Sequence, residues 1–168
     1  MNLQRENMIQ FCIVGWKNSG KTFFAQELIE YFSKKNLIVA SIKHAHHNFD
    51  IDKPDTDSYL HRQAGSQQVI ISSSKRWAKI VELKDKSEKK LNELIQELDA
   101  PDIVIIEGFK DASHPKIEII RKDSDNYLFP KIKNVLCLVS DNKIDTNLPQ
   151  FKRKDIGKIA EFILTTVK

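Results

Sequence analysis

The stretch from Gly15 to Thr22, GWKNSGKT, matches the pattern G-x-x-x-x-G-K-[ST] of a phosphate-binding loop. In such a loop, successive backbone N–H groups surround the phosphate oxygens, and the following helix presents its positive end to them. Gly15 and Gly20 stand where a Cβ would obstruct the tight turn or the close approach of the phosphate. Lys21 is expected to reach the β- and γ-phosphates, and Thr22 to offer its hydroxyl to Mg²⁺. The motif predicts a nucleoside triphosphate site.

A carboxylate that could serve the same Mg²⁺ follows a strand-like run later in the chain. Residues 103–106 are four consecutive apolar residues, typical of a parallel strand buried on both faces, and Glu107 follows them directly. Such a strand delivers the acid to the carboxyl edge of the sheet, where ligands bind in open α/β folds. We therefore predict that Glu107 serves the metal, either directly or through water. Gly108 follows and suits a loop that moves with nucleotide state.

A polar segment, residues 43–57, follows another predicted strand and would lie at the same edge. Lys43 and His44 at its start suit a nucleotide or a second phosphorylated ligand, and its aspartates, among them Asp52, could hold metal-bound water. Imidazole and carboxylate groups also ligate Zn²⁺ or Ni²⁺, so a transition-metal site is the alternative. Its histidine ligands would be His44, His46 and His47. The chain has no closing set of cysteines here, which favours the polar loop.

The loop that follows the predicted strand 135–139 could contact the base. Asn142 to Asp145 spell N-K-x-D, a pattern that sets an aspartate against the N1 and N2 donors of guanine. The tetrad begins three residues past the strand, later than is usual. The sequence therefore leaves open whether Asp141 or Asp145 would face the base.

The rest of the chain supplies elements that would hold these residues at one edge. Apolar runs of strand length alternate with segments of helical period. The predicted strands are 11–14, 37–42, 68–71, 78–83, 103–106, 117–120 and 135–139, and the predicted helices are 21–35, 57–64, one that begins at Ser87, and one capped by Asp155. This alternation predicts an α/β fold and a single domain, 1–168, in which a mostly parallel β-sheet is flanked by helices on both faces.

Composition narrows the classes of function. The 168 residues include 27 basic and 23 acidic ones, a net charge of +4 that suits anionic ligands. The basic clusters lack interleaved aromatic residues, so we expect no nucleic-acid partner. No apolar run approaches the ~20 residues of a membrane helix, and no signal peptide is evident, so we expect a cytoplasmic protein with no membrane partner. Cys12 and Cys137 lie in apolar runs and are expected to be buried, reduced thiols.

Together, four blocks resemble the molybdopterin-guanine dinucleotide biosynthesis protein B family. They are residues 15–22, residues 42–65 (IKHAHHNFDIDKPDTDSYLHRQAG), residues 103–110 (IVIIEGFK) and residues 135–141. The second block is the discriminating one, because many nucleotide-binding families share the first. The likeness spans nearly the whole chain. It departs at Asp55 and Ser66, where the family often has Gly and Ala, and both positions are peripheral.

The resemblance implies a P-loop NTPase fold that binds GTP and Mg²⁺. It also implies a homodimer with slow intrinsic GTP hydrolysis that assists a molybdenum cofactor guanylyltransferase in joining GMP to molybdopterin. Carried over by position, the phosphate-binding residues are Gly15, Lys17, Asn18, Ser19, Gly20, Lys21 and Thr22. Thr22 and Glu107 would lie near Mg²⁺. Lys43, His44 and the aspartates after them would form a second edge loop whose role is less settled.

Two other functions remain alternatives at this stage. A small-molecule kinase could use the same loop, but such an enzyme usually has a lid with clustered arginines. The arginines beyond the N-terminus are scattered, at Arg62, Arg76, Arg121 and Arg153. A nucleotide-driven metal-insertion chaperone would use the histidines instead. Since no arginine finger or water-positioning glutamine is recognisable beside the loop, we expect tight binding with slow turnover.

Overall fold

The computed structural model describes residues 8–45, 49–84 and 87–167. Contacts divide the chain into two compact units, one made of the segments up to His44 and from Leu91 onward, the other of the segment between them. The sequence predicted a single domain, and this division into two units does not test that prediction. The first unit contains the phosphate-binding motif, so its sheet determines the geometry of the candidate site.

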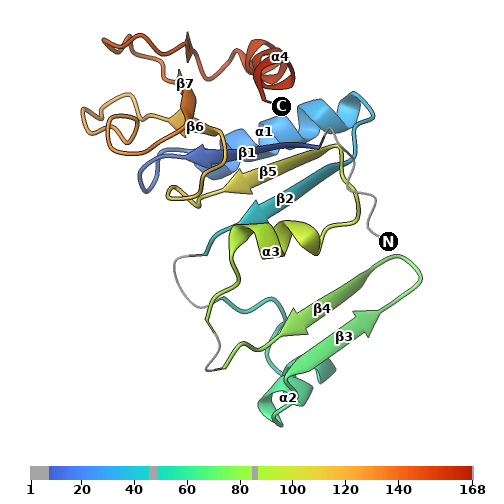
Figure 1. Ribbon diagram of the computed structural model, residues 1–168. Helices are drawn as coiled ribbons and strands as arrows, with labels where there is room; N and C mark the ends of the chain where they lie inside the picture. The colour runs from blue at the N-terminus through green and yellow to red at the C-terminus, as the bar shows by residue number, and fades with distance from the viewer. Residues whose placement is uncertain (1–7, 46–48, 85–86, 168) are drawn as a thin grey trace. The chain divides into compact units, whose positions relative to one another are not determined.

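The first unit is built on a six-stranded sheet in the order β2-β5-β1-β6-β7-β8. All neighbouring strands pair in parallel. The strands are β1 (Ile9–Val14), β2 (Val39–Lys43), β5 (Ile103–Glu107), β6 (Lys116–Ile119), β7 (Val135–Val139) and β8 (Gln150–Phe151). The arrowheads of β1, β2 and β5 point to the same edge of the sheet (Figure 1). The residues that follow these strands therefore meet at that edge, as predicted.

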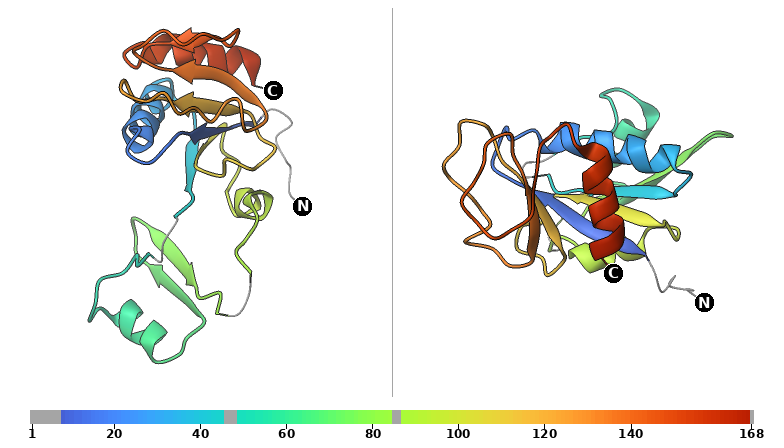
Figure 2. Two further views of the ribbon diagram at one scale, coloured as in Figure 1. Left: turned by 90° about the vertical axis from the view of Figure 1, so that its left-hand side faces the viewer. Right: turned by 90° about the horizontal axis from the view of Figure 1, so that it is seen from above.

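Helices cover both faces of this sheet, because its central strands are apolar on both sides. Phe11 and Ile13 of β1 pack in one cluster with α1 (Lys21–Lys34) and α4 (Ile156–Thr166). These two helices also contact each other (Figure 2). Cys12 and Val14 point to the opposite face, where α3 (Leu91–Gln96) contributes Leu91. The mostly parallel sheet flanked by helices on both faces, predicted from the sequence, is confirmed.

Both cysteines are free and buried in this sheet. Burial raises the pKa of the Cys12 thiol to about 11 and that of the Cys137 thiol to about 12. Both therefore stay protonated at neutral pH and act as small apolar side chains.

The second unit consists of α2 (Asp57–Gln63) and an antiparallel hairpin of β3 (Gln68–Ser72) and β4 (Trp77–Val81). The helix was predicted to end before Gly65, and it ends at Gln63 with Ala64 as its C-cap. Val69 on β3 is buried, whereas Ile70 and Trp77 are exposed. In the part of the chain that the structure describes, no helix is long and apolar enough to cross a membrane.

One prediction about these elements was wrong, and one strand was not predicted. The helix expected to begin at Ser87 begins only at Leu91, because the four residues before Leu91 have no apolar side chain to bury. Strand β8 was not predicted at all, since two residues at a sheet edge give no periodic signal. Because strand β8 was not predicted, a residue of the candidate site that follows it was missed as well.

Candidate nucleotide-binding site

The phosphate-binding motif forms a tight loop between β1 and α1. Gly15, Asn18 and Gly20 have positive φ angles of 150°, 60° and 89°. A Cβ on Gly15 would lie 2.4 Å from the carbonyl oxygen of Ile119 and 2.7 Å from Oγ of Ser19. Only glycine fits that position, because backbone atoms of β6 cannot move aside as a flexible side chain would. The loop thus has the shape that its sequence motif predicts.

Two polar groups inside the loop could interact with a bound anion. Ser19 is 2% exposed, and within the described residues its Oγ has no hydrogen-bond partner. Such an orphaned buried hydroxyl costs roughly 1–3 kcal/mol. The Lys21 Nζ donates to the carbonyl oxygens of Gly15 (2.9 Å) and Trp16 (2.8 Å), which are neutral acceptors. These residues fit a phosphate group.

The charge state of Lys21 reflects its position. Partial burial lowers the pKa of the Lys21 amine, the nearby Glu107 carboxylate partly opposes that effect, and Lys43 adds to it. Desolvation disfavours the charged form, so a phosphate at this position would offset the cost of holding the cation there. Lys17 and Asn18 on the same loop have exposed side chains.

The predicted metal partners come together at the carboxyl edge. The hydroxyl of Thr22 donates to Oε1 of Glu107 at 2.7 Å, and Nζ of Lys43 lies 3.5 Å from the same oxygen. The side chain of Glu107 is only 16% exposed. Strand register explains the meeting, because Glu107 pairs with Ile13 on one side and with Lys43 on the other. A hydroxyl and a carboxylate oxygen are ligands that suit Mg²⁺.

His44 is held against the chain that leaves β5. Its ring stacks on Phe109 with centroids 4.5 Å apart, and its backbone N–H donates to the carbonyl oxygen of Glu107 at 2.9 Å. A Cβ on Gly108, whose φ is 101°, would lie 2.9 Å from Cβ of His44. His44 therefore lies at the predicted edge. Its contact with a phosphorylated ligand stays a prediction.

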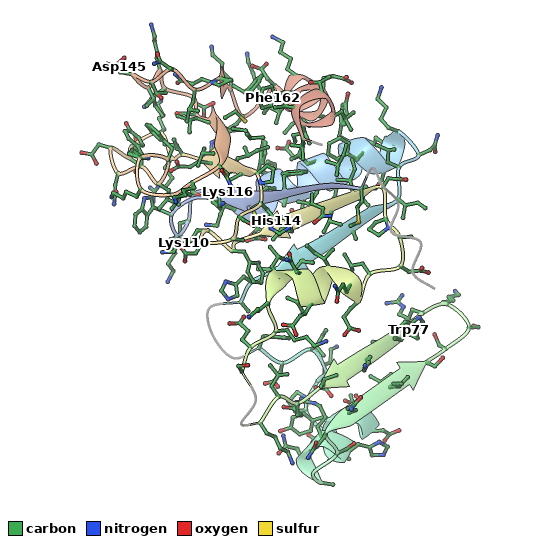
Figure 3. All side chains as sticks on the ribbon, viewed as in Figure 1. Trp77, Lys110, His114, Lys116, Asp145 and Phe162 are labelled. Atoms are coloured by element: carbon green, nitrogen blue, oxygen red, sulfur yellow. The ribbon has the colours of Figure 1, made fainter. Side chains whose placement is uncertain are left out.

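The structure distinguishes the two aspartates of the loop after β7. Asp141 lies beside Arg153, with 3.8 Å between the Arg153 Nε and the Asp141 Oδ2, and the Nη2 of Arg153 donates to the carbonyl oxygen of Ser19 at 2.7 Å. Asp141 is thus linked to the phosphate loop. Asp145 is exposed and lies on the outer connection between β7 and α4 (Figure 3). Its neighbour Ile144 is fixed by the side chain of Gln150.

Arg153 is a residue of the site that the sequence did not reveal. It lies two residues past Phe151, the end of β8, and so at the same carboxyl edge of the parallel sheet. Recognition of the short edge strand would have been the signal, because basic residues at that edge are candidates for contact with an anionic ligand.

Asp52, predicted to assist the metal, belongs to the second unit and is paired there with an arginine. The carboxylate of Asp52 accepts hydrogen bonds from Nη2 (2.5 Å) and Nε (3.1 Å) of Arg62. Hydrogen bonding from Arg62 lowers the pKa of Asp52. The same guanidinium also pairs with Asp50 and Glu82. Both oxygens of Asp52 are therefore engaged, and its role at a metal stays a prediction.

The alternative transition-metal site is only partly visible. His46 and His47 lie outside the described residues. Among the residues described, no group of three or more His, Cys, Asp or Glu side chains is arranged to hold a metal ion.

Comparison with known proteins identifies the family. Residues 10–141 match the family model described as molybdopterin guanine dinucleotide synthesis protein B, MobB. The chain belongs to this family. Two proteins named molybdopterin-guanine dinucleotide biosynthesis adapter protein are similar over most of their length. The one from Escherichia coli is 31% identical over 153 residues, 89% of this chain and 87% of the relative. The one from Haemophilus influenzae is 36% identical over 156 residues, 90% and 85% of the two chains.

Solved MobB structures share the fold. A crystal structure of molybdopterin-guanine biosynthesis protein B superposes with a TM-score of 0.76 at 27% identity, covering 95% of this chain and all of that one. Bacillus subtilis MobB superposes with a TM-score of 0.74 at 25% identity, covering 96% and 99% of the two chains. The P-loop NTPase-like α/β fold and the resemblance to the MobB family, both predicted from the sequence, are confirmed.

Proposed function

We propose that this chain is a GTP- and Mg²⁺-binding accessory protein of molybdopterin-guanine dinucleotide biosynthesis. Membership of the MobB family supports the accessory role. The observation that carries the nucleotide and metal proposal is the hydrogen bond from Thr22 to Glu107 beside a glycine-shaped loop with an orphaned Ser19 hydroxyl. Together these groups offer N–H and O–H donors to a phosphate and oxygen ligands to a metal.

In this proposal each residue of the site has one task. The loop from Gly15 to Gly20 surrounds the β-phosphate with N–H groups, and Lys21 exchanges its two neutral carbonyl acceptors for phosphate oxygens. Thr22 and Glu107 hold Mg²⁺, directly or through water, and the metal neutralises charge on the phosphates. Lys43 and His44 border the same edge and contact the nucleotide or a second phosphorylated ligand. Asp141 accepts from the N–H donors of guanine.

The partners belong to the same proposal. We infer that the chain acts as a homodimer with a molybdenum cofactor guanylyltransferase and with molybdopterin, and that it hydrolyses GTP slowly. The net charge of +4 supports an encounter with the anionic ligands GTP and molybdopterin.

Titration of the purified protein with GTP and ATP, with Mg²⁺ and with EDTA, tests the nucleotide proposal. We expect GTP to bind more tightly than ATP and Mg²⁺ to increase the affinity. A clear preference for ATP would contradict the role of Asp141, and affinity independent of Mg²⁺ would contradict that of Glu107.

The accessory role needs a separate assay. The guanylyltransferase of the same organism is given molybdopterin and GTP, and formation of the dinucleotide is measured with and without this chain. We expect wild-type protein to raise the yield and the Lys21→Ala variant not to. Rapid transfer of the γ-phosphoryl group to a small-molecule acceptor, without an effect on the transferase, would favour a kinase instead.

A further inference from the structure

Arg153 connects three parts of the first unit through one guanidinium group. Its Nη2 donates to the carbonyl oxygens of Ser19 (2.7 Å) and Ile120 (2.8 Å). Its Nε lies 3.8 Å from Oδ2 of Asp141. The phosphate loop, the end of β6 and the loop after β7 are therefore joined at a single cation.

The phosphate loop is shaped to admit this side chain. A Cβ on Gly20 would lie 2.6 Å from Nη1 of Arg153 and, its chain neighbours aside, would meet no other described residue within 4 Å. Gly20 is the residue immediately before α1, the helix end that favours anions. The second glycine of the motif therefore serves two purposes, since it takes a φ of 89° and leaves room for the guanidinium.

The contacts of Arg153 need the planar geometry of a guanidinium. Donors on different nitrogens point to the backbone of the phosphate loop and toward Asp141 at the same time. The side chain of a lysine has one nitrogen. It could donate to the carbonyl oxygens, but it has no second nitrogen to place beside the carboxylate. The side chain of Arg153 is 30% exposed and that of Asp141 is 47% exposed, so the carboxylate remains open to a ligand.

We propose that Arg153 is a positioning residue that orients Asp141 for purine recognition and ties that recognition to the shape of the phosphate loop. This inference rests on the proposed function. The ligand class is a nucleoside triphosphate whose purine presents both an N1–H and an exocyclic 2-amino donor, because the two oxygens of a carboxylate oriented by a neighbouring cation can accept both. Without Arg153, Asp141 loses the cation that lies 3.8 Å from its carboxylate, and we expect the second donor to add little to binding.

A purely structural role would give a different result. If Arg153 only fastened the segment after β8 to the phosphate loop, its removal would weaken all nucleoside triphosphates equally. GTP and ITP separate the two cases, because ITP keeps N1–H and the triphosphate but lacks the 2-amino group. The ratio of their affinities measures how well Asp141 is positioned.

The test uses the full chain with Mg²⁺ and measures GTP and ITP affinities by calorimetry. The variants are Arg153→Met, Arg153→Lys, Asp141→Asn and the double variant Arg153→Met with Asp141→Asn. Lys154→Met is the matched control, since Lys154 is an exposed neighbour of the same charge. Thermal unfolding of each variant establishes that it is folded, and Arg153→Lys, which keeps the charge, provides the test if Arg153→Met does not fold.

We expect Arg153→Met to lower GTP affinity about tenfold and to bring the GTP to ITP ratio close to one. Arg153→Lys should lower the ratio in the same direction, and Lys154→Met should leave both affinities within about twofold of wild type. The double variant should have the same ratio as Asp141→Asn alone, because the two residues act together.

Three results would overturn the inference. If an Arg153 variant binds both nucleotides more weakly with an unchanged ratio, Arg153 only holds the phosphate loop in place. If binding of both nucleotides is unchanged, Arg153 has no role in nucleotide binding. Either leaves the proposed function intact if wild-type protein still prefers GTP. Absence of nucleotide binding by wild-type protein, or no preference for GTP, would instead remove the proposed function and this inference with it.

Discussion

The two units each place a cation among oxygen atoms, but they use it in opposite ways. In the second unit Arg62 pairs with three carboxylates, at 3.2 Å from Asp50 and 2.5 Å from both Asp52 and Glu82. In the first unit the hydrogen bonds of Lys21 go to neutral backbone carbonyls. Charge satisfied within the chain supports structure, whereas charge held by neutral acceptors stays available to a ligand. The comparison supports the phosphate loop, rather than the Arg62 cluster, as the proposed nucleotide-binding region.

The units also differ in what holds them together. The sheet of the first unit is buried on both faces, and strand β5 from Ile103 to Ile106 has almost no exposed surface. In the second unit, Val69 is the one described residue that is buried. A two-stranded hairpin is marginally stable by itself, so the ion pairs of Arg62 and the packing of α2 contribute a larger share of the stability of the second unit. The following four changes test this contrast.

Replacement of Lys21 by Ala should have the largest effect. Removal of the amine leaves the phosphates without a charge-assisted donor, and affinity for GTP should fall about 100-fold. The melting temperature should change little, because the hydrogen bonds of the Lys21 amine go to carbonyls of its own loop. Calorimetry and thermal unfolding measure the two effects, with Lys35→Ala at the other end of α1 as control. Loss of folding would show that Lys21 is structural, the role that we infer for Arg62.

Thr22→Val should lower GTP affinity about tenfold when Mg²⁺ is present and should have little effect in EDTA. The substitution keeps the shape of the side chain but removes the hydroxyl that contacts Glu107. Thr165→Val makes the same chemical change on α4 and serves as the control. An equal loss with and without Mg²⁺ would contradict a metal role for this hydroxyl.

Arg62→Met should loosen the second unit and leave nucleotide affinity unchanged. Removal of the guanidinium leaves three carboxylates close together without their cation. Amide hydrogen exchange in residues 49–84 should then accelerate about tenfold, with unchanged protection in β1 and β5. Arg76→Met, an exposed residue of the β3–β4 turn, is the matched control. Equal protection in both variants would refute the structural role of the Arg62 cluster.

A fall in pH should have the smallest of the four effects, and it should destabilise the second unit. Arg62 lowers the pKa of Asp52 below its ordinary value of 3.8, so the pair stabilises the folded second unit above that pH. This stabilisation is lost as the pH falls below 3.8 toward the lowered pKa. Protection factors, which correct for the pH dependence of intrinsic amide exchange, should therefore be lower for residues 49–84 at pH 3 than at pH 5. The Arg62→Met variant should lack this component of the pH dependence.

The fold and the core of the candidate site could be predicted because their signals are local. A glycine pattern specifies the phosphate loop, and an apolar run ending in Glu107 specifies an acid at the sheet edge. The positions of Arg153 and Asp52 depend on contacts between segments far apart in sequence. Arg153 lies 134 residues from Ser19, and its signal depended on the two-residue strand β8. No periodicity in the sequence reports that Asp52 and Arg62 would pair.

The two buried cysteines make the protein convenient for optical measurements. Cys12 and Cys137 are the chain's only cysteines, and both have a strongly raised pKa inside the sheet. Thiol-reactive dyes attack the thiolate, so neither residue should label in the folded state at neutral pH. A single cysteine introduced at exposed Lys154 would then carry a fluorophore beside the phosphate loop without prior removal of the native thiols. Nucleotide binding and release could be followed in real time on otherwise wild-type protein.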